Sequence, residues 1–233
     1  MDKQVGGKPM GTVDDPTLLQ VQADLVELTE LVKQAMARAT HSLLTADVHA
    51  AESVISDDTK IDAVNNNIER LCLEALSTQA LNPMEVRSAV ASMRMATTLE
   101  RMGDLAAHVA KQARLRYPFV SIPAELQGTF ARMGHLANDV VGSTGQVVAT
   151  RNLAFAADIS SADQEMDDIH RELFSTVLAP DWTHGVQAAI DVTLLSRYFE
   201  RFADHGVTVA RRVAFVVTGE PYGVTDLEAA DSA

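Results

Sequence analysis

The chain has 233 residues, of which 47% are hydrophobic and 22% are charged, so a packed core is available and wholesale disorder is excluded. Aromatic residues make up only 5%, and this composition favours helices over sheets. The formal net charge of −13 argues against a nucleic-acid binder, because neutralising phosphates requires a basic face. Cations and basic protein surfaces are the expected electrostatic partners.

Neither end of the chain predicts a membrane segment or a compact element. No signal peptide opens the sequence, and no apolar run approaches the ~20 residues that span a bilayer, so we expect a cytoplasmic protein. Residues 1–14 are rich in glycine and polar side chains, residues 220–233 are acidic, and both segments are predicted to be flexible. The single cysteine, Cys72, lies in a helical pattern and is expected to be a small buried thiol.

The first half predicts three helices. The first follows Asp15, a plausible cap, and Pro16, a proline of the first turn, and it carries apolar residues at spacings of three and four as far as Leu43. The second starts near residue 47. Pro83 ends the second helix and can start the third, which runs through Val109.

The middle of the sequence is marked by Tyr117, Pro118 and Pro123, the strongest punctuation there. We therefore predict a first three-helix repeat over residues 15–118 and a second over residues 122–219. The second repeat contains helices at about 124–151, 154–179 and 184–218, and Gly219 stops the last one. Helices of ~25–35 residues would be ~40–50 Å long, a length that suits bundles with short loops.

The two halves match residue by residue. Glu100-Arg101-Met102-Gly103-Asp104 lies one hundred residues before Glu200-Arg201-Phe202-Ala203-Asp204, and Asp58 and Asp62 fall opposite Asp163 and Asp167 in the middle helices. An internal duplication is the simplest account. The predicted fold is therefore all-α and internally duplicated, with six long helices in two three-helix bundles.

Each half contributes two pairs of acidic residues spaced four apart, which places both members of a pair on one helix face. Like charges at this spacing destabilise a helix by ~0.2–0.5 kcal/mol per pair, so their repetition calls for compensation. A divalent or trivalent cation would provide it, since two helices offer the carboxylate oxygens that hard ions prefer. The candidate metal ligands are Asp58, Asp62, Glu100 and Asp104 in the first half and Asp163, Asp167, Glu200 and Asp204 in the second.

Other interpretations of these residues stay open. Any single acidic pair could be a solvated helix surface, and Arg101 or Arg201 could pair with a neighbouring carboxylate. His108 and His170 do not occupy equivalent places in the two halves, and we interpret both as exposed or packed rather than as ligands. His205 directly follows Asp204, so its side chain points about 100° away around the helix and is no better placed. Oxygen ligands admit Mg, Mn, Fe or Ca, and Zn is not excluded.

At these residues the sequence resembles the PhoU family, the cytoplasmic regulators of bacterial phosphate uptake and phosphate-starvation signalling. The likeness runs from about Asp15 to Gly219, and the family's Glu-Arg-x-Gly/Ala-Asp signature appears once in each half. The stretch Asp191-Val192-Thr193-Leu194-Leu195-Ser196-Arg197 is similar to the actinobacterial branch. One departure is Glu85-Val86-Arg87, where the family has Asp-Leu-Arg, with the nearby proline displaced to Pro83, so the start of the third helix is expected to differ in detail.

The resemblance implies one metal site per bundle at the eight carboxylates already named. It also implies a negative regulator that couples the phosphate ABC transporter to a sensor histidine kinase, at the inner face of the membrane. We further expect a homodimer and no binding of nucleic acid.

A regulatory scaffold without catalysis is the leading functional hypothesis, because the sequence has no Gly-x-Ser-x-Gly elbow, phosphate-cradling glycine loop or cysteine pair. One alternative is a carboxylate-bridged metalloenzyme of the ferritin-like type. That class needs Glu-x-x-His on two helices, and Asp167 with His170 is the nearest approach. Another alternative is a metal-free helical adaptor, whose partner binding would survive chelation.

Overall fold

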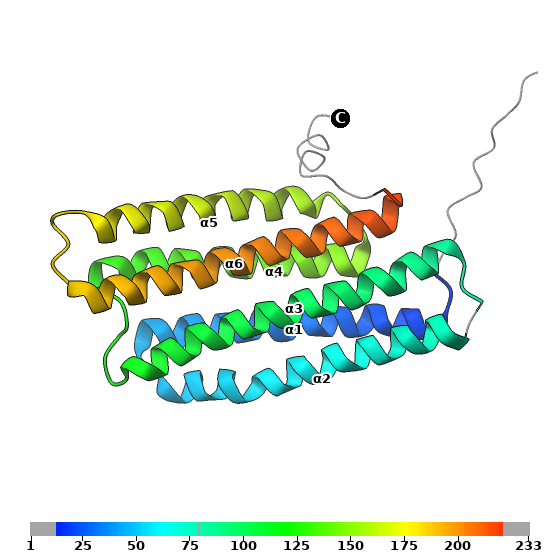
Figure 1. The fold of residues 1–233 in the computed structure, drawn as a ribbon, viewed down its shortest axis with the longest axis horizontal. Helices are drawn as coiled ribbons and strands as arrows, with labels where there is room; N and C mark the ends of the chain where they lie inside the picture. Colours follow the sequence, from blue (N-terminus) through cyan, green and yellow to red (C-terminus); the bar gives the residue numbers. More distant parts are fainter. Residues whose placement is uncertain (1–12, 79, 221–233) are drawn as a thin grey trace, which may run out of the picture.

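The protein is described here by a computed structural model that covers residues 13–78 and 80–220 (Figure 1). The described residues form six long α-helices, which confirms the predicted all-α, duplicated fold. They are α1 (Pro16–Thr45), α2 (Val48–Thr78), α3 (Pro83–Arg116), α4 (Gln127–Thr150), α5 (Phe155–Leu178) and α6 (Gly185–Thr218). The segments predicted to be flexible, 1–14 and 220–233, fall outside the described residues except for 13, 14 and 220.

The helices pack as two bundles. α1, α2 and α3 contact one another, and so do α4, α5 and α6. The bundles meet where α1 lies against α4 and α3 lies against α6, which leaves α2 and α5 on opposite flanks of the molecule (Figure 1). Within the described part of the chain, no helix is both long enough and apolar enough to cross a membrane.

The start of α1 follows from its first residues. The Asp15 carboxylate accepts a hydrogen bond from the Leu18 N–H at 3.0 Å, and Pro16 occupies the first turn, where its missing N–H costs nothing. This confirms the predicted cap. Val13, just before it, is buried and belongs to the core.

The start of α3 explains the departure at Glu85. The Asn82 side chain accepts from the N–H groups of Met84 and Glu85, and Glu85 reaches back to the Asn82 N–H at 2.9 Å, forming a capping box. The other Glu85 oxygen accepts from the N–H groups of Asp14 and Asp15, each at 3.2 Å. The buried carboxylate of Glu85 therefore ties the beginning of α3 to the beginning of α1.

The fourth helix begins later than predicted. Residues Ala124–Leu126 form a short 3-10 turn, η1, and the α-helix starts at Gln127 without a side-chain cap. Pro123 precedes the turn, and its side chain cannot accept a hydrogen bond as a capping residue does. The sequence therefore gives only a weak signal for the start of this helix. The end of α6 is as predicted, because Gly219 adopts the left-handed conformation with φ 77°.

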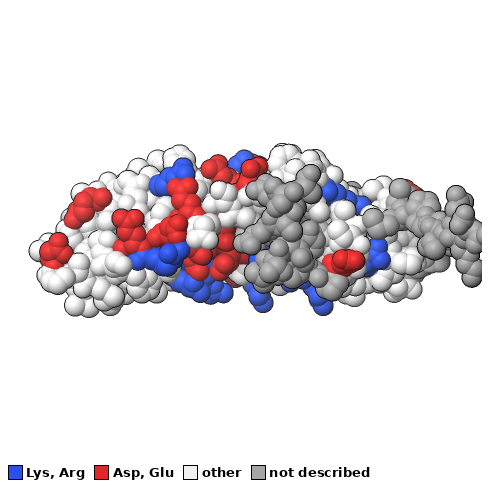
Figure 2. Space-filling model, turned by 90° about the horizontal axis from the view of Figure 1, so that it is seen from above, with Lys and Arg blue, Asp and Glu red and all other residues white. Residues whose placement is uncertain are grey.

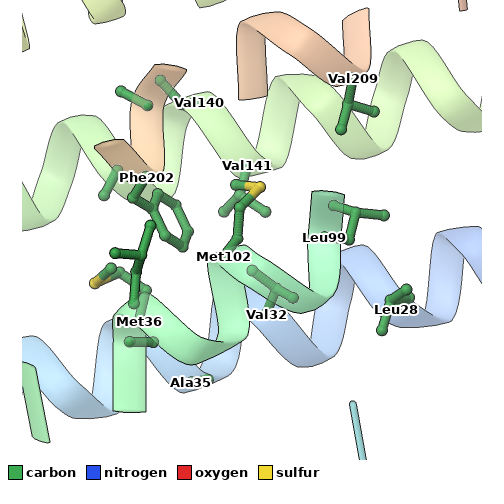
Figure 3. Packing of buried hydrophobic residues seen from close by; sticks show 14 of the residues in the cluster. Leu28, Val32, Ala35, Met36, Leu99, Met102, Val140, Val141, Phe202 and Val209 are labelled. Atoms are coloured by element: carbon green, nitrogen blue, oxygen red, sulfur yellow. The ribbon is translucent and has the colours of Figure 1, made fainter. Parts of the chain in front are cut away.

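One continuous hydrophobic core runs through both bundles. Figure 3 shows its centre, where side chains from four helices interdigitate. They are Leu28, Val32, Ala35 and Met36 of α1, Leu99 and Met102 of α3, Val140 and Val141 of α4, and Phe202 and Val209 of α6, all buried. α1 and α4 approach closely at Gly134, where an added Cβ would lie 2.4 Å from Thr40 Cγ2. The repeats are therefore joined by shared packing as well as by the connecting loop.

Candidate metal centres

The first cluster of carboxylates lies between α2 and α3, and we call Asp58, Asp62, Glu100 and Asp104 the first quartet. A loop of few residues makes the two helices neighbours, so the acidic faces of both can meet. Burial raises the pKa of Asp58, and the charges of Asp104 and Asp62 raise it further. Burial likewise raises the pKa of Glu100, followed by the effects of Asp104 and Asp62. The predicted ligands of the first half therefore share one electrostatic environment.

The second cluster lies between α5 and α6, and we call Asp163, Asp167, Glu200 and Asp204 the second quartet. Burial, followed by the charges of Asp204, Asp167 and Glu200, raises the pKa of Asp163 to about 7. Burial also raises the pKa of Glu200, while Arg197 opposes that shift. The structure thus brings together the four predicted residues of each half, at equivalent places in the repeat.

Few of these carboxylates have a partner of opposite charge. Among the described residues, Glu200 is the only one of the eight with an ion pair, and its partner is Arg197. Glu200 is only 8% exposed, and its second oxygen, Oε2, is buried without a hydrogen-bond partner. Asp163 Oδ1 is in the same situation. A buried acceptor without a partner raises the free energy of the folded protein. A cation or a hydrogen-bond donor at the second quartet would therefore be stabilising.

The carboxylates do not converge on one point as they stand. Within residues 13–78 and 80–220, no three His, Cys, Asp or Glu side chains are arranged to hold a metal ion. Like charges repel each other, so carboxylates gathered in this way are unfavourable unless a cation or a proton neutralises them. The set of oxygen donors fits a hard cation, but binding requires the side chains to turn toward it.

The histidines near the quartets are engaged elsewhere. His170 Nδ1 lies 2.9 Å from Ser196 Oγ, and the ring packs edge-on against Phe174. Burial lowers the pKa of His170. His108 stacks on Tyr198 with ring centroids 5.3 Å apart. These contacts agree with the interpretation of both residues as packed or exposed side chains rather than ligands.

Two basic residues beside the quartets, Lys111 and Arg211, were not identified from the sequence. Lys111 lowers the pKa of Asp58 and Arg211 lowers that of Asp163, against the larger effect of burial in each case. Lys111 and Arg211 lie seven residues after Asp104 and Asp204, which is two helix turns along the same face. That spacing could have shown, from the sequence, that both residues lie on the same helix face as the carboxylates. Arg101 and Arg201, which the sequence offered as partners, make no ion pair in the described part of the chain.

The face that carries α5 is rich in charge. Figure 2 views the molecule from above, from the α5 side of Figure 1, and shows acidic side chains gathered there with basic side chains beside them. An acidic surface of this kind attracts cations before any specific ligand forms a bond.

Cys72 does not take part in these sites. It is fully buried in α2, as predicted, and burial followed by the charge of Glu69 raises the pKa of its thiol to about 12. A thiol with that pKa stays protonated at neutral pH, and only the thiolate is a good nucleophile.

Two repeated three-helix bundles, each with a carboxylate quartet between its second and third helices, define an all-α protein of the duplicated-bundle class. The family model described as PhoU domain matches residues 25–113 and 130–213, once in each bundle. The chain belongs to the PhoU family.

Curated relatives and solved structures agree with this assignment. The chain is 44% identical over 210 residues to the Phosphate-specific transport system accessory protein PhoU homolog 2 of Mycobacterium tuberculosis, covering 90% of this chain and 99% of the relative. It is 43% identical to PhoU homolog 1 of Mycobacterium leprae, covering 90% and 95% of the two chains. The crystal structure of the phosphate transport system regulatory protein PhoU from Streptococcus pneumoniae shows the same fold, with a TM-score of 0.79, 23% identity and coverage of 89% and 98%.

Proposed function

We propose that this chain is a negative regulator of phosphate uptake and phosphate-starvation signalling. It acts as a cytoplasmic adaptor, at the inner face of the membrane, that links the phosphate ABC transporter to a sensor histidine kinase. The observation that carries the proposal is the match to relatives named phosphate-specific transport system accessory proteins, which extends over 99% of the length of the first of them. The adaptor role needs no catalytic residues of its own.

Each bundle, in this proposal, binds one Mg, Mn, Fe or Zn ion through its quartet. The bound ion would neutralise the crowded carboxylates. Support comes from the repetition of both quartets and from the buried, unpartnered oxygens of Asp163 and Glu200. The carboxylates of each quartet come from two helices, so turning them toward a common point would fix α2 against α3 and α5 against α6.

An adaptor also needs a surface for its partners. Where α5 ends and α6 begins, a groove of about 530 Å³ is lined by apolar residues. Several of them are well exposed, namely Phe174, Leu178, Val186, Ile190 and Leu194. Exposed apolar groups gathered in this way are typical of protein interaction sites, and they support binding to another protein.

Deletion of the gene tests the regulatory role. In phosphate-rich medium, the deletion strain should express phosphate-starvation genes, and the wild-type chain supplied on a plasmid should restore repression. The variant Asp163→Asn/Glu200→Gln should restore it poorly if the second quartet is needed. Asp168→Asn, which changes an exposed carboxylate outside the quartets, is the matched control and should behave as wild type. Repression that persists in the deletion strain would contradict the proposal.

A metal-free adaptor is the second candidate, because the carboxylates of each quartet stand apart as described. Binding of purified protein to the cytoplasmic part of the kinase, measured with and without EDTA, separates the two. Loss of binding with EDTA favours the metal-organised adaptor, and unchanged binding favours the metal-free one. The ferritin-like alternative receives no support from His170, whose ring bonds to Ser196 and packs on Phe174. Sedimentation equilibrium tests the expected homodimer.

A further inference from the structure

A groove of about 340 Å³ lies between α3 and α6, away from the apolar groove at the end of α5. Its floor is mostly apolar, with Val90 and Ala91 from α3 and Phe215 from α6. Its charged lining is purely basic and consists of Arg94 from α3 and Arg211 and Arg212 from α6. In a chain with a net charge of −13, a groove lined by three arginines and no acidic residue is unexpected.

The three guanidinium groups have no partner within the described residues. None of them forms an ion pair or donates a side-chain hydrogen bond to the described part of the protein. The Nε atoms of Arg211 and Arg212 are buried and unpartnered. Arg94 and Arg212 are close enough for the charge of Arg94 to lower the pKa of Arg212, after the larger effect of burial. The charge of Arg211 lowers the pKa of Asp163 in the second quartet, but the two side chains form no ion pair.

The internal repeat supplies a comparison for this groove. At the other end of the α3–α6 contact, the position equivalent to Ala91 is Asp191, which is 3% exposed. Arg116 donates to both oxygens of Asp191 at 2.7 and 2.8 Å, and Gln112 donates to it at 2.6 Å. There the chain provides its own anion for its basic and amide donors. In the groove lined by Arg94, Arg211 and Arg212, Ala91 takes the place that Asp191 has at the other end. No carboxylate of the groove lining is therefore available to these arginines.

We propose that the groove formed by Arg94, Arg211 and Arg212 binds a small phosphate-class dianion, either inorganic phosphate or the phosphoryl group of a small phosphate ester. Guanidinium groups donate in a planar fork that matches the oxygens of a phosphoryl group. Three cations suit a dianion better than a single carboxylate, which would leave two of them without compensation. The volume of about 340 Å³ exceeds the needs of the phosphoryl group, and the apolar floor formed by Val90 and Phe215 would receive the body of an ester. The site does not depend on the proposed metal centres.

Isothermal titration calorimetry of the full chain tests the proposal with inorganic phosphate and with phenyl phosphate. Each titration is made on the protein as purified and again in EDTA, so that a metal ion at the quartets cannot be the cause of binding. We expect saturable binding of at least one phosphate in both conditions. Binding of both probes shows that the phosphoryl group suffices, and tighter binding of phenyl phosphate identifies the ester as the preferred source. Benzoate should bind at least tenfold more weakly than phenyl phosphate.

Variants locate the site. Arg94→Gln/Arg212→Gln should weaken binding at least tenfold, while Arg70→Gln/Arg132→Gln, which removes the same charge from two exposed arginines, should change it less than twofold. The single variant Arg94→Gln alters an exposed side chain and should fold normally, so it serves if the double variant is unstable. Four results would each overturn the proposal. They are no saturable binding by the wild type, equal binding of benzoate and phenyl phosphate, equal losses in the two double variants, and loss of binding in EDTA.

Discussion

At the scale of single residues, the second quartet contains two buried oxygens, Asp163 Oδ1 and Glu200 Oε2, that have no hydrogen-bond partner in the described part of the chain. Residues four apart share a helix face whatever surrounds the helix, so Asp58 with Asp62 and Glu200 with Asp204 could be paired from the sequence. Which oxygen is buried depends on the neighbouring helix, and the sequence could not predict that Glu200 Oε2 is buried without a partner. The pairing of Glu200 with Arg197, three residues earlier, was also missed, although the spacing allows it.

The raised pKa of Asp163 predicts how stability depends on pH in the metal-free protein. Burial and the neighbouring carboxylates raise this pKa from 3.8 to about 7, so between these values the unfolded carboxyl has lost its proton while the folded one keeps it. The contribution of Asp163 to stability is therefore complete at low pH and is lost as the pH rises through about 7. Asparagine does not titrate, so the variant Asp163→Asn should not lose this stability as the pH rises.

Urea denaturation in EDTA measures the effect as the difference between Asp163→Asn and wild type at several pH values. The variant should gain relative stability as the pH rises, reaching on the order of 1–2 kcal/mol at about pH 8 once screening by solvent is allowed for. Asp168→Asn, at an exposed carboxylate, should show no such trend. A difference for Asp163→Asn that is independent of pH would contradict the assignment.

At the scale of helices, the number of residues between equivalent positions of the two repeats shows where the helices differ in length. Equivalent residues are 100 apart between α3 and α6 but 105 apart between α2 and α5. α2 has 31 residues and α5 has 24, and α2 continues further beyond Asp62 than α5 does beyond Asp167. Most of the change in length therefore lies past the acidic residues, and none of it lies between them, which leaves both quartets intact. Apolar periodicity and proline positions predicted the helices well, whereas the start of α4 depends on a 3-10 turn that has no sequence signature of comparable strength.

The close contact between α1 and α4 predicts that a side chain at Gly134 would lower the stability of the protein. A Cβ at this position would lie 2.4 Å from Thr40 Cγ2, so Gly134→Ala should reduce the free energy of unfolding by about 1–3 kcal/mol through overpacking. Thr40→Ala removes the clashing methyl together with a buried hydroxyl that has no hydrogen-bond partner, so the double variant should recover most of the loss.

Gly128→Ala is the control for this cycle, because nothing lies within 4 Å of the added Cβ in the same helix. It should leave stability unchanged or raise it by up to about 1 kcal/mol through helix propensity. Chemical denaturation of the four variants provides the values. If Gly134→Ala proves as stable as Gly128→Ala, the described approach of α1 and α4 is wrong.

At the scale of the whole molecule, the two repeats share one core. The sequence indicated two bundles, because each repeat has three amphipathic helices and a proline-rich boundary separates them. Periodicity shows that a helix has a buried face, but it does not show which helix covers that face. Met102 of α3 and Phe202 of α6 are equivalent in the repeat, and both are fully buried where the bundles meet (Figure 3). The joining of the bundles therefore became visible only in the structure.

A shared core predicts that both repeats unfold together. Trp182, the single tryptophan, lies between α5 and α6 and reports on the second repeat, whereas far-UV circular dichroism reports on all helices. Both signals should give the same transition midpoint in guanidinium chloride, as expected for two-state unfolding. Two separated transitions would mean that the repeats are independently stable and that the packing of α1 on α4 and of α3 on α6 adds little.

The proposal that each quartet holds one cation is tested by the metal content of the purified protein. Elemental analysis after equilibration with Mg, Mn, Fe and Zn salts, followed by removal of free ions, should give two bound ions per wild-type chain. Glu100→Ala or Glu200→Ala alone should leave one, and the double variant should leave none, while Asp168→Asn should keep two. A wild-type chain that retains no metal, or a double variant that retains as much as wild type, would contradict the account.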